Sequence, residues 1–154
     1  MKIWVDGDAM PGEIKDIILR AAARLKVQAV VVANKNVQVG SGAFVSFVRV
    51  TQGADVADAY IVERSEPGDL CITADIPLAA AVVDKGLIAL DPRGDVYSAS
   101  TVGERLATRD LMASLREAGM QTGGPPPFDS KAKQRFAARF DSLLTRAVRE
   151  AAGR

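Results

Sequence analysis

Histidine is missing from this 154-residue sequence, and cysteine occurs once, as Cys71. The absence of histidine excludes a serine–histidine or cysteine–histidine catalytic pair and every zinc site that needs a histidine ligand. A single cysteine can form neither an intrachain disulfide nor an all-cysteine zinc site, which favours a reducing compartment, and we expect a cytoplasmic protein. Any enzymatic proton chemistry must therefore come from carboxylates, lysines, tyrosines or metal-bound water.

The sequence also lacks a long hydrophobic run and an excess of charge of either sign. No apolar stretch approaches the roughly 20 residues of a membrane span, so we expect no contact with a membrane. The start MKIWVDGD is too acidic for a signal peptide. Lys and Arg number 20 and Asp and Glu 19, so the net charge of +1 favours no class of partner. Hydrophobic residues make up 48% of the chain, which predicts one folded domain over 1–154.

Short apolar runs alternate with helical patterns through the first part of the chain. The expected strands cover 2–5, 27–33, 47–51, 70–73 and 87–90. The expected helices between them cover 13–25, 57–64 and 78–85. Continuous apolar strands that alternate with helices predict an α/β fold, in which a central, mostly parallel sheet is flanked by helices. Ligands of such sheets bind at the carboxyl ends of the strands.

The second part of the chain is expected to be helical. A core of about 1–118 should end in a helix that begins at Thr101, with Thr101 and Glu104 as a capping box. The loop QTGGPPPF follows, and a C-terminal helix covers about 131–151, so that 119–154 form the loop and final helix. Apolar residues at helical spacing should pack this helix on the core: Phe136, Phe140, Leu143 and Ala147. Its basic residues indicate either a solvated flank or contact with nucleic acid: Lys131, Lys133, Arg135 and Arg139.

Aspartates follow the predicted strands. Asp6 and Asp75 come at or just after the ends of two apolar runs, and Asp8 lies close behind Asp6. Asp55 and Asp58 are three residues apart at the start of a helix, so they share a face. Carboxylates gathered without cations raise one another's pKa or recruit a divalent cation. Mg²⁺ and Mn²⁺ prefer such oxygen ligands.

Each aspartate also has a purely structural interpretation. Asp55 and Asp75 could cap the helices that follow them, and the helix dipole favours Asp58 in a first turn. Asp8 could shape a turn. Asp6 has the weakest structural alternative, because it directly ends a strand that should be buried.

Arginines offer candidate phosphate ligands. Arg93 lies in the turn DPRG after the last expected strand. Arg105, Arg109 and Arg116 share one face of the following helix, and arginine suits bidentate contact with phosphate. The alternative is an exposed helix face whose charge is balanced by acids on the same helix.

Five motifs in this order resemble the YaiI/YqxD family of bacterial proteins over nearly the whole chain. They are DGDAMP (6–11), ADVAD (54–58), PGDLCITADIPLA (67–79), DPRG (91–94) and TGGPP (122–126). This family is similar to the PIN-like, NYN-related nucleases. The resemblance implies a compact three-layer PIN-like domain, a Mg²⁺ or Mn²⁺ cofactor, and a nucleic-acid partner, with RNA favoured over DNA.

The resemblance also implies roles for individual residues. Asp6 matches the acid at the end of the first strand of these nucleases, and Asp75 matches the acid of their T-x-D context. Asp55 or Asp58 matches the acid from the central helix, and Asp8 matches the family's own DxD. We therefore expect Asp6, Asp8 and Asp75 to hold the metal, with Asp55 and Asp58 assisting catalysis and Arg93, Arg105 and Arg109 contacting phosphate.

The sequence departs from the family pattern at two positions. Met10 replaces the cysteine of the usual DADACP, so a thiol has no role there. Asp91 replaces the asparagine of the usual NPRG, which adds a negative charge near the expected site.

Two further functions fit the motifs. One is a non-catalytic module of the same fold that binds nucleic acid or protein. The other is a phosphatase of the haloacid dehalogenase type, with Asp6 as nucleophile and Asp8 as acid. That chemistry also needs a lysine and an acidic pair later in the chain, and no convincing lysine stands near TADIPLA. The sequence gives no oligomeric state.

Overall fold

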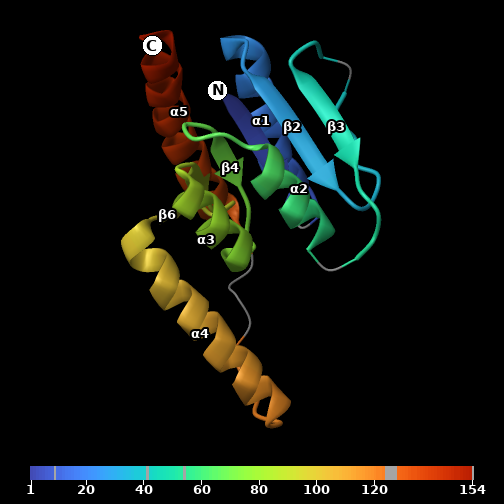
Figure 1. The fold of residues 1–154 in the computed structure, drawn as a ribbon, viewed down its shortest axis with the longest axis vertical. Helices are drawn as coiled ribbons and strands as arrows, with labels where there is room; N and C mark the ends of the chain where they lie inside the picture. The colour runs from blue at the N-terminus through green and yellow to red at the C-terminus, as the bar shows by residue number, and fades with distance from the viewer. Residues whose placement is uncertain (9, 41, 54, 124–127, 154) are drawn as a thin grey trace.

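The computed structural model describes residues 1–8, 10–40, 42–53, 55–123 and 128–153 (Figure 1). Its strands are β1 (Lys2–Asp6), β2 (Gln28–Ala33), β3 (Val45–Arg49), β4 (Leu70–Ile72), β5 (Ile88–Leu90) and β6 (Val96–Tyr97). Its helices are α1 (Gly12–Leu25), α2 (Val56–Arg64), α3 (Ile76–Lys85), α4 (Ala99–Glu117) and α5 (Ser130–Ala152).

The strands form one sheet in the order β3-β2-β1-β4-β5-β6. Every pairing is parallel except the last, between β5 and β6. The expected α/β fold with a mostly parallel central sheet is therefore confirmed. The sequence pattern did not predict β6, because a strand of two residues is too short to show a periodicity.

Helices cover both faces of the sheet, which explains why its strands are apolar throughout. Successive side chains of a strand point to opposite faces. Ile3 and Val5 of β1 accordingly pack in the cluster that contains α1 and α5. Trp4, between them, packs in the other cluster with Ile61 of α2 and Leu78 of α3.

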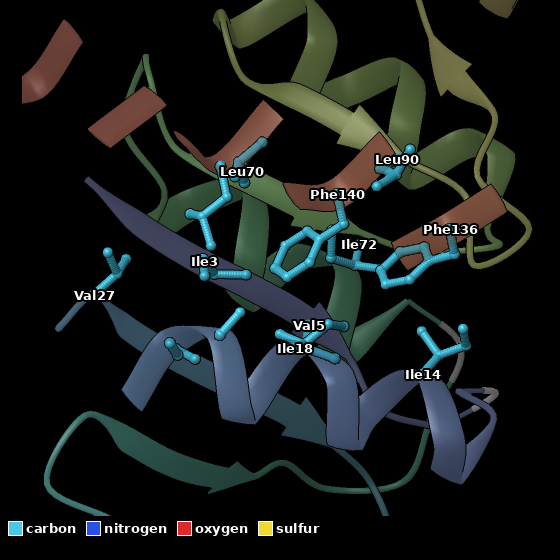
Figure 2. Packing of buried hydrophobic residues seen from close by; sticks show 14 of the residues in the cluster. Ile3, Val5, Ile14, Ile18, Val27, Leu70, Ile72, Leu90, Phe136 and Phe140 are labelled. Atoms are coloured by element: carbon cyan, nitrogen blue, oxygen red, sulfur yellow. The ribbon is translucent and has the colours of Figure 1, made fainter. Parts of the chain in front are cut away.

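Helix α5 is anchored by its aromatic residues. The rings of Phe136 and Phe140 stack with centroids 5.3 Å apart. Figure 2 shows both rings in the core beside Ile72 of the sheet. The fully or nearly fully buried stripe is Ala132, Phe136, Phe140, Leu144 and Ala147. Leu143, which the sequence placed in this stripe, lies at its margin and is partly buried.

Helix α4 begins two residues before the expected start, at Ala99. The hydroxyl of Ser98 accepts from the backbone N of Thr101 at 3.2 Å, and the Thr101 hydroxyl accepts from the Ser98 N at 3.2 Å. The predicted capping box of Thr101 with Glu104 is therefore wrong, because Thr101 is the third helical residue and not the cap. The part 124–127 of the predicted loop lies outside the described residues.

Helix α4 packs on α3 and then extends away from the body (Figure 1). None of its residues is buried, and Leu111 is 57% exposed. Along the described residues, no helix combines the length and the apolar character that crossing a bilayer requires.

A buried carboxylate aligns β1 with β4. The side chain of Asp69 accepts hydrogen bonds from the Lys2 N at 2.9 Å, the Trp4 Nε1 at 3.0 Å and the Glu66 N at 2.9 Å. These donors compensate for the burial of Asp69, which is 4% exposed. Because the two strands start level with one another, their carboxyl ends also meet at one place on the sheet edge.

Candidate functional site

A cavity of about 470 Å³ opens at the carboxyl ends of β1 and β4. The chain runs from β1 outward to β2 and β3 on one side, and continues through β4 and β5 on the other. Such a reversal of strand order leaves a crevice in which α/β proteins bind ligands. The polar side chains that line the cavity are Asp6, Asp8, Asn34, Asp55, Asp58 and Asp75. The structure thus brings all five predicted acidic residues to one cavity.

Thr73 joins the two strand ends. Its hydroxyl donates to Oδ2 of Asp6 at 2.8 Å and accepts from the backbone N of Asp75 at 2.9 Å. Thr73 has no exposed surface, and its backbone carbonyl accepts from the hydroxyl of Tyr97 at 3.2 Å. Sequence reasoning treated Thr73 only as context for Asp75. Its position two residues before an aspartate was the signal of this role.

The structural interpretations of the aspartates have different outcomes. Asp75 does cap α3, because its Oδ1 accepts from the Leu78 N at 3.0 Å. Asp55 occupies the cap position of α2 with a left-handed φ of 67°, but its side chain makes no capping hydrogen bond. Asp8 contacts Asn34, the residue after β2. Its two carboxylate oxygens accept hydrogen bonds from the backbone N of Asn34 at 2.9 and 3.1 Å. Each carboxylate nevertheless lines the cavity.

The crowding of these acids changes their protonation. Burial raises the pKa of Asp58 from 3.8 to about 7. The negative charges of Asp75 and Asp6, a hydrogen bond with Asp75 and the charge of Asp55 add to this effect. Burial also raises the pKa of Asp6; the hydrogen bond from Thr73 opposes this effect, and the charges of Asp75 and Asp8 add to it. Strongly perturbed carboxylates in a cavity are typical of functional sites.

The donor set of the cavity suits a hard cation. Carboxylate and amide oxygens line it, and these are the ligands that Mg²⁺ and Mn²⁺ prefer. The carboxylates do not yet stand in a metal-binding arrangement, since no group of three or more acidic, histidine or cysteine residues in the described part of the chain could hold a metal ion as it stands. The site therefore fits the expected cation in the chemistry of its donors, and a bound cation would have to draw them closer.

Arg105, one of the predicted phosphate ligands, is engaged within the protein. Its guanidinium lies 3.4 Å from Oδ2 of Asp91 and 4.2 Å above the ring of Tyr97. Asp91 is 7% exposed and also accepts from the Tyr97 hydroxyl at 3.2 Å and the Arg93 N at 2.6 Å. The acid that replaces the asparagine of NPRG thus neutralises Arg105 and fastens α4 to the turn after β5.

Arg109 lies further along α4 and is exposed, 3.1 Å from its neighbour Asp110. Arg105 and Arg109 line a second cavity of about 680 Å³ together with Ile76 of α3. Ile76 directly follows Asp75, so this arginine-lined cavity adjoins the acidic one.

The sequence of this chain is similar to those of known proteins over nearly its whole length. The model of the family described as "Uncharacterized BCR, YaiI/YqxD family" matches residues 4–146. The chain belongs to the YaiI/YqxD family. A UPF0178 protein of Geobacter sulfurreducens is 52% identical over 150 residues, which cover 97% of this chain and 99% of the relative. A UPF0178 protein of Myxococcus xanthus is 51% identical over 149 residues, which cover 97% of each chain. No solved structure matches the chain.

For this member of the YaiI/YqxD family, the structure separates the parts of the motif PGDLCITADIPLA. Asp69 aligns the strands at one edge of the sheet, while Thr73 and Asp75 belong to the cavity at the other. Cys71 lies between them and is fully buried, and burial raises the pKa of its thiol. We therefore assign Cys71 to the core rather than to the site.

Proposed function

We propose that the acidic cavity is the active site of a divalent-cation-dependent phosphodiesterase that acts on nucleic acid, with RNA favoured over DNA. The observation that carries the proposal is the gathering of five aspartates at the point where the strand order reverses. The described lining residues include no lysine or arginine that would neutralise them. Resemblance to PIN-like nucleases supports the reaction class by analogy.

Asp6, Asp8 and Asp75 would hold the cation, Mg²⁺ or Mn²⁺. When bound, the cation would stabilise negative charge on a phosphate and lower the pKa of the attacking water. Thr73 orients Asp6 through its hydroxyl and presents Asp75 through the backbone, so it is a positioning residue. The resemblance and the single cysteine also lead us to propose a cytoplasmic location.

Asp58 and the arginines supply the remaining chemistry. With a pKa of about 7, Asp58 can accept or release a proton near neutral pH. Arg109 faces the adjoining cavity, where its guanidinium can contact a phosphate group of the substrate. Arg105, already paired with Asp91, positions α4 for this contact.

The phosphatase alternative loses support. Haloacid dehalogenase chemistry needs a lysine beside the aspartates, and the described lining of the acidic cavity contains none. The binding-module alternative keeps one specific observation in its favour, which is that no ready-made metal site exists among the described residues.

The decisive experiment measures cation binding and cleavage separately. Mn²⁺ binding to the wild type and to Asp75→Asn would be measured by calorimetry, and cleavage by single-turnover assays on labelled RNA and DNA oligonucleotides. We expect Asp75→Asn to weaken Mn²⁺ binding and to lower the cleavage rate by roughly 100-fold or more, because the carboxamide is a neutral and poorer ligand. Asp16→Asn, on the exposed surface of α1, is the matched control and should leave both unchanged.

Cleavage that persists in chelator, or that survives Asp75→Asn, would refute the proposal. Binding of Mn²⁺ and of RNA without cleavage of any oligonucleotide would instead establish the binding module.

A further inference from the structure

Helix α5 is the most basic element of a chain that is nearly neutral overall. It carries two acidic residues, Asp141 and Glu150, and six basic ones, which gives a balance of +4 in a protein whose total is +1. The basic residues are Lys131, Lys133, Arg135, Arg139, Arg146 and Arg149. The net charge of the whole chain therefore does not reveal that basic residues are concentrated on α5.

Three of these arginines line a groove. Arg135, Arg139 and Arg146 line a cavity of about 560 Å³ between α5 and the turn after β5, which contributes Gly94 and Asp95. Their spacing of four and seven residues places them on one exposed face of the helix, beside the buried stripe. At 1.5 Å per residue the row extends over about 16 Å.

The turn that lines this groove packs directly against the backbone of α5. Gly94 has a left-handed φ of 94°, and a Cβ at this position would lie 2.8 Å from the carbonyl carbon of Arg135. Only glycine allows the turn to lie so close to α5 in this conformation. The turn and the arginine row are therefore held in a fixed relation.

The guanidinium groups of the row are available to a ligand. The side chain of Arg139 makes no ion pair or hydrogen bond with any described residue. Arg135 pairs with Asp95 at 2.8 Å and Arg146 with Glu150 at 3.2 Å, and both pairs are exposed. Exposed pairs contribute little to stability, so a phosphate can replace the carboxylate at little cost.

We propose that this groove binds the phosphodiester backbone of a nucleic acid. A row of arginines can contact several phosphates along one polynucleotide strand, and the planar guanidinium suits bidentate contact with phosphate. That the same strand leads to the acidic cavity rests on the proposed function. The positions of the two cavities agree with such a path. Because β5 is parallel to β4, its carboxyl end lies on the edge of the sheet that holds the acidic cavity, and the turn that lines the groove follows this end. Figure 1 shows the C-terminal end of α5 at the opposite end of the sheet from the arrowheads of β2 and β3, so the row runs away from that edge.

Binding would be measured by fluorescence anisotropy with a labelled single-stranded RNA of mixed sequence, in chelator so that no cleavage occurs. The variants are Arg139→Gln, Arg146→Gln and the double variant. We expect the slope of log K against log salt to decrease by about 0.7 for each arginine lost. Arg139→Lys should retain most of the slope, because the charge remains.

Arg64→Gln is the matched control. Arg64 is exposed on α2, on the other face of the sheet, where its guanidinium lies 4.1 Å above the ring of Tyr60. Its replacement should leave the salt dependence of RNA binding unchanged.

An unchanged slope in the double variant, with folding verified by circular dichroism, would overturn the proposal. A polyglutamate peptide that binds as tightly as RNA, and is weakened equally by the double variant, would overturn it in favour of an acidic protein partner. The same assay on Asp75→Asn distinguishes the groove from the active site. Arginine-dependent RNA binding by this variant supports the groove even if no cleavage is ever observed.

Discussion

The hydroxyl of Thr73 donates a 2.8 Å hydrogen bond to Oδ2 of Asp6, so one buried side chain joins the carboxyl ends of β1 and β4. The same hydroxyl accepts from the backbone N of Asp75 at 2.9 Å. A single oxygen atom therefore contacts both the carboxylate of Asp6 and the backbone of Asp75. Removing that oxygen should disturb both aspartates together.

Thr73→Val keeps the shape of the side chain and removes the hydroxyl. We expect the free energy of unfolding to fall by about 1–3 kcal/mol, because the backbone N of Asp75 loses its acceptor at a partly buried position. Mn²⁺ binding should weaken as well, because Asp6 is no longer oriented. Urea unfolding and calorimetry would measure the two effects. Thr73→Ser, which retains the hydroxyl, is the control, and wild-type Mn²⁺ affinity in Thr73→Val would show that Thr73 does not position the ligands.

The stability of the cation-free protein should depend on the protonation of Asp58. Its pKa in the folded protein is raised from 3.8 to about 7, so the folded state holds a proton that the unfolded chain releases at lower pH. The stabilising effect of this proton is fully present below pH 3.8 and is lost as the pH rises through about 7. Asp6, whose pKa is also raised, acts in the same direction.

We therefore expect the stability of the wild type relative to Asp58→Asn to decrease between about pH 4 and pH 7 in chelator, because only the wild type can ionise at this position. Urea unfolding of both proteins at several pH values would test this. A relative stability that rises over this window would show that ionised Asp58 is stabilised in the fold, contrary to the crowding of acids seen here.

Gly94→Ala should destabilise the protein by about 2–4 kcal/mol, since it combines a left-handed backbone conformation with contact against the backbone of α5. Gly103→Ala is the matched control. Gly103 lies within α4 with nothing within 4 Å of an added Cβ, so alanine there should be neutral or stabilise the helix by about 0.5–1 kcal/mol. Thermal unfolding of both variants would measure the contrast. Equal effects of the two substitutions would refute the close packing of the turn on α5.

Local patterns predicted the elements of this fold well. The apolar runs that became β1, β2 and β4 were recognised from sequence, and so was Asp75 as a helix cap, because capping depends on residues three apart along the chain. The start of α4 was predicted wrongly for a related reason. Ser98 and Thr101 both suit a cap position, and the sequence alone does not choose between them.

The partners of charged residues could not be predicted in the same way. Arg105 was expected to contact phosphate, but the fold places Asp91, from the turn after β5, within 3.4 Å of it. The three hydrogen-bond donors of Asp69 could not be predicted either, because two of them lie more than 60 residues away in the sequence.

The sequence by itself determined most of the strands and helices, though not β6, and that aspartates follow the apolar strands, because these properties depend on patterns only a few residues long. Only the tertiary structure decided that β1 lies beside β4, that Thr73 therefore meets Asp6, and that burial and the neighbouring acids raise the pKa of Asp58 to about 7. The reason is physical. Strand order and electrostatic interaction are set by distances between segments that are far apart in the chain, and those distances arise only when the core packs.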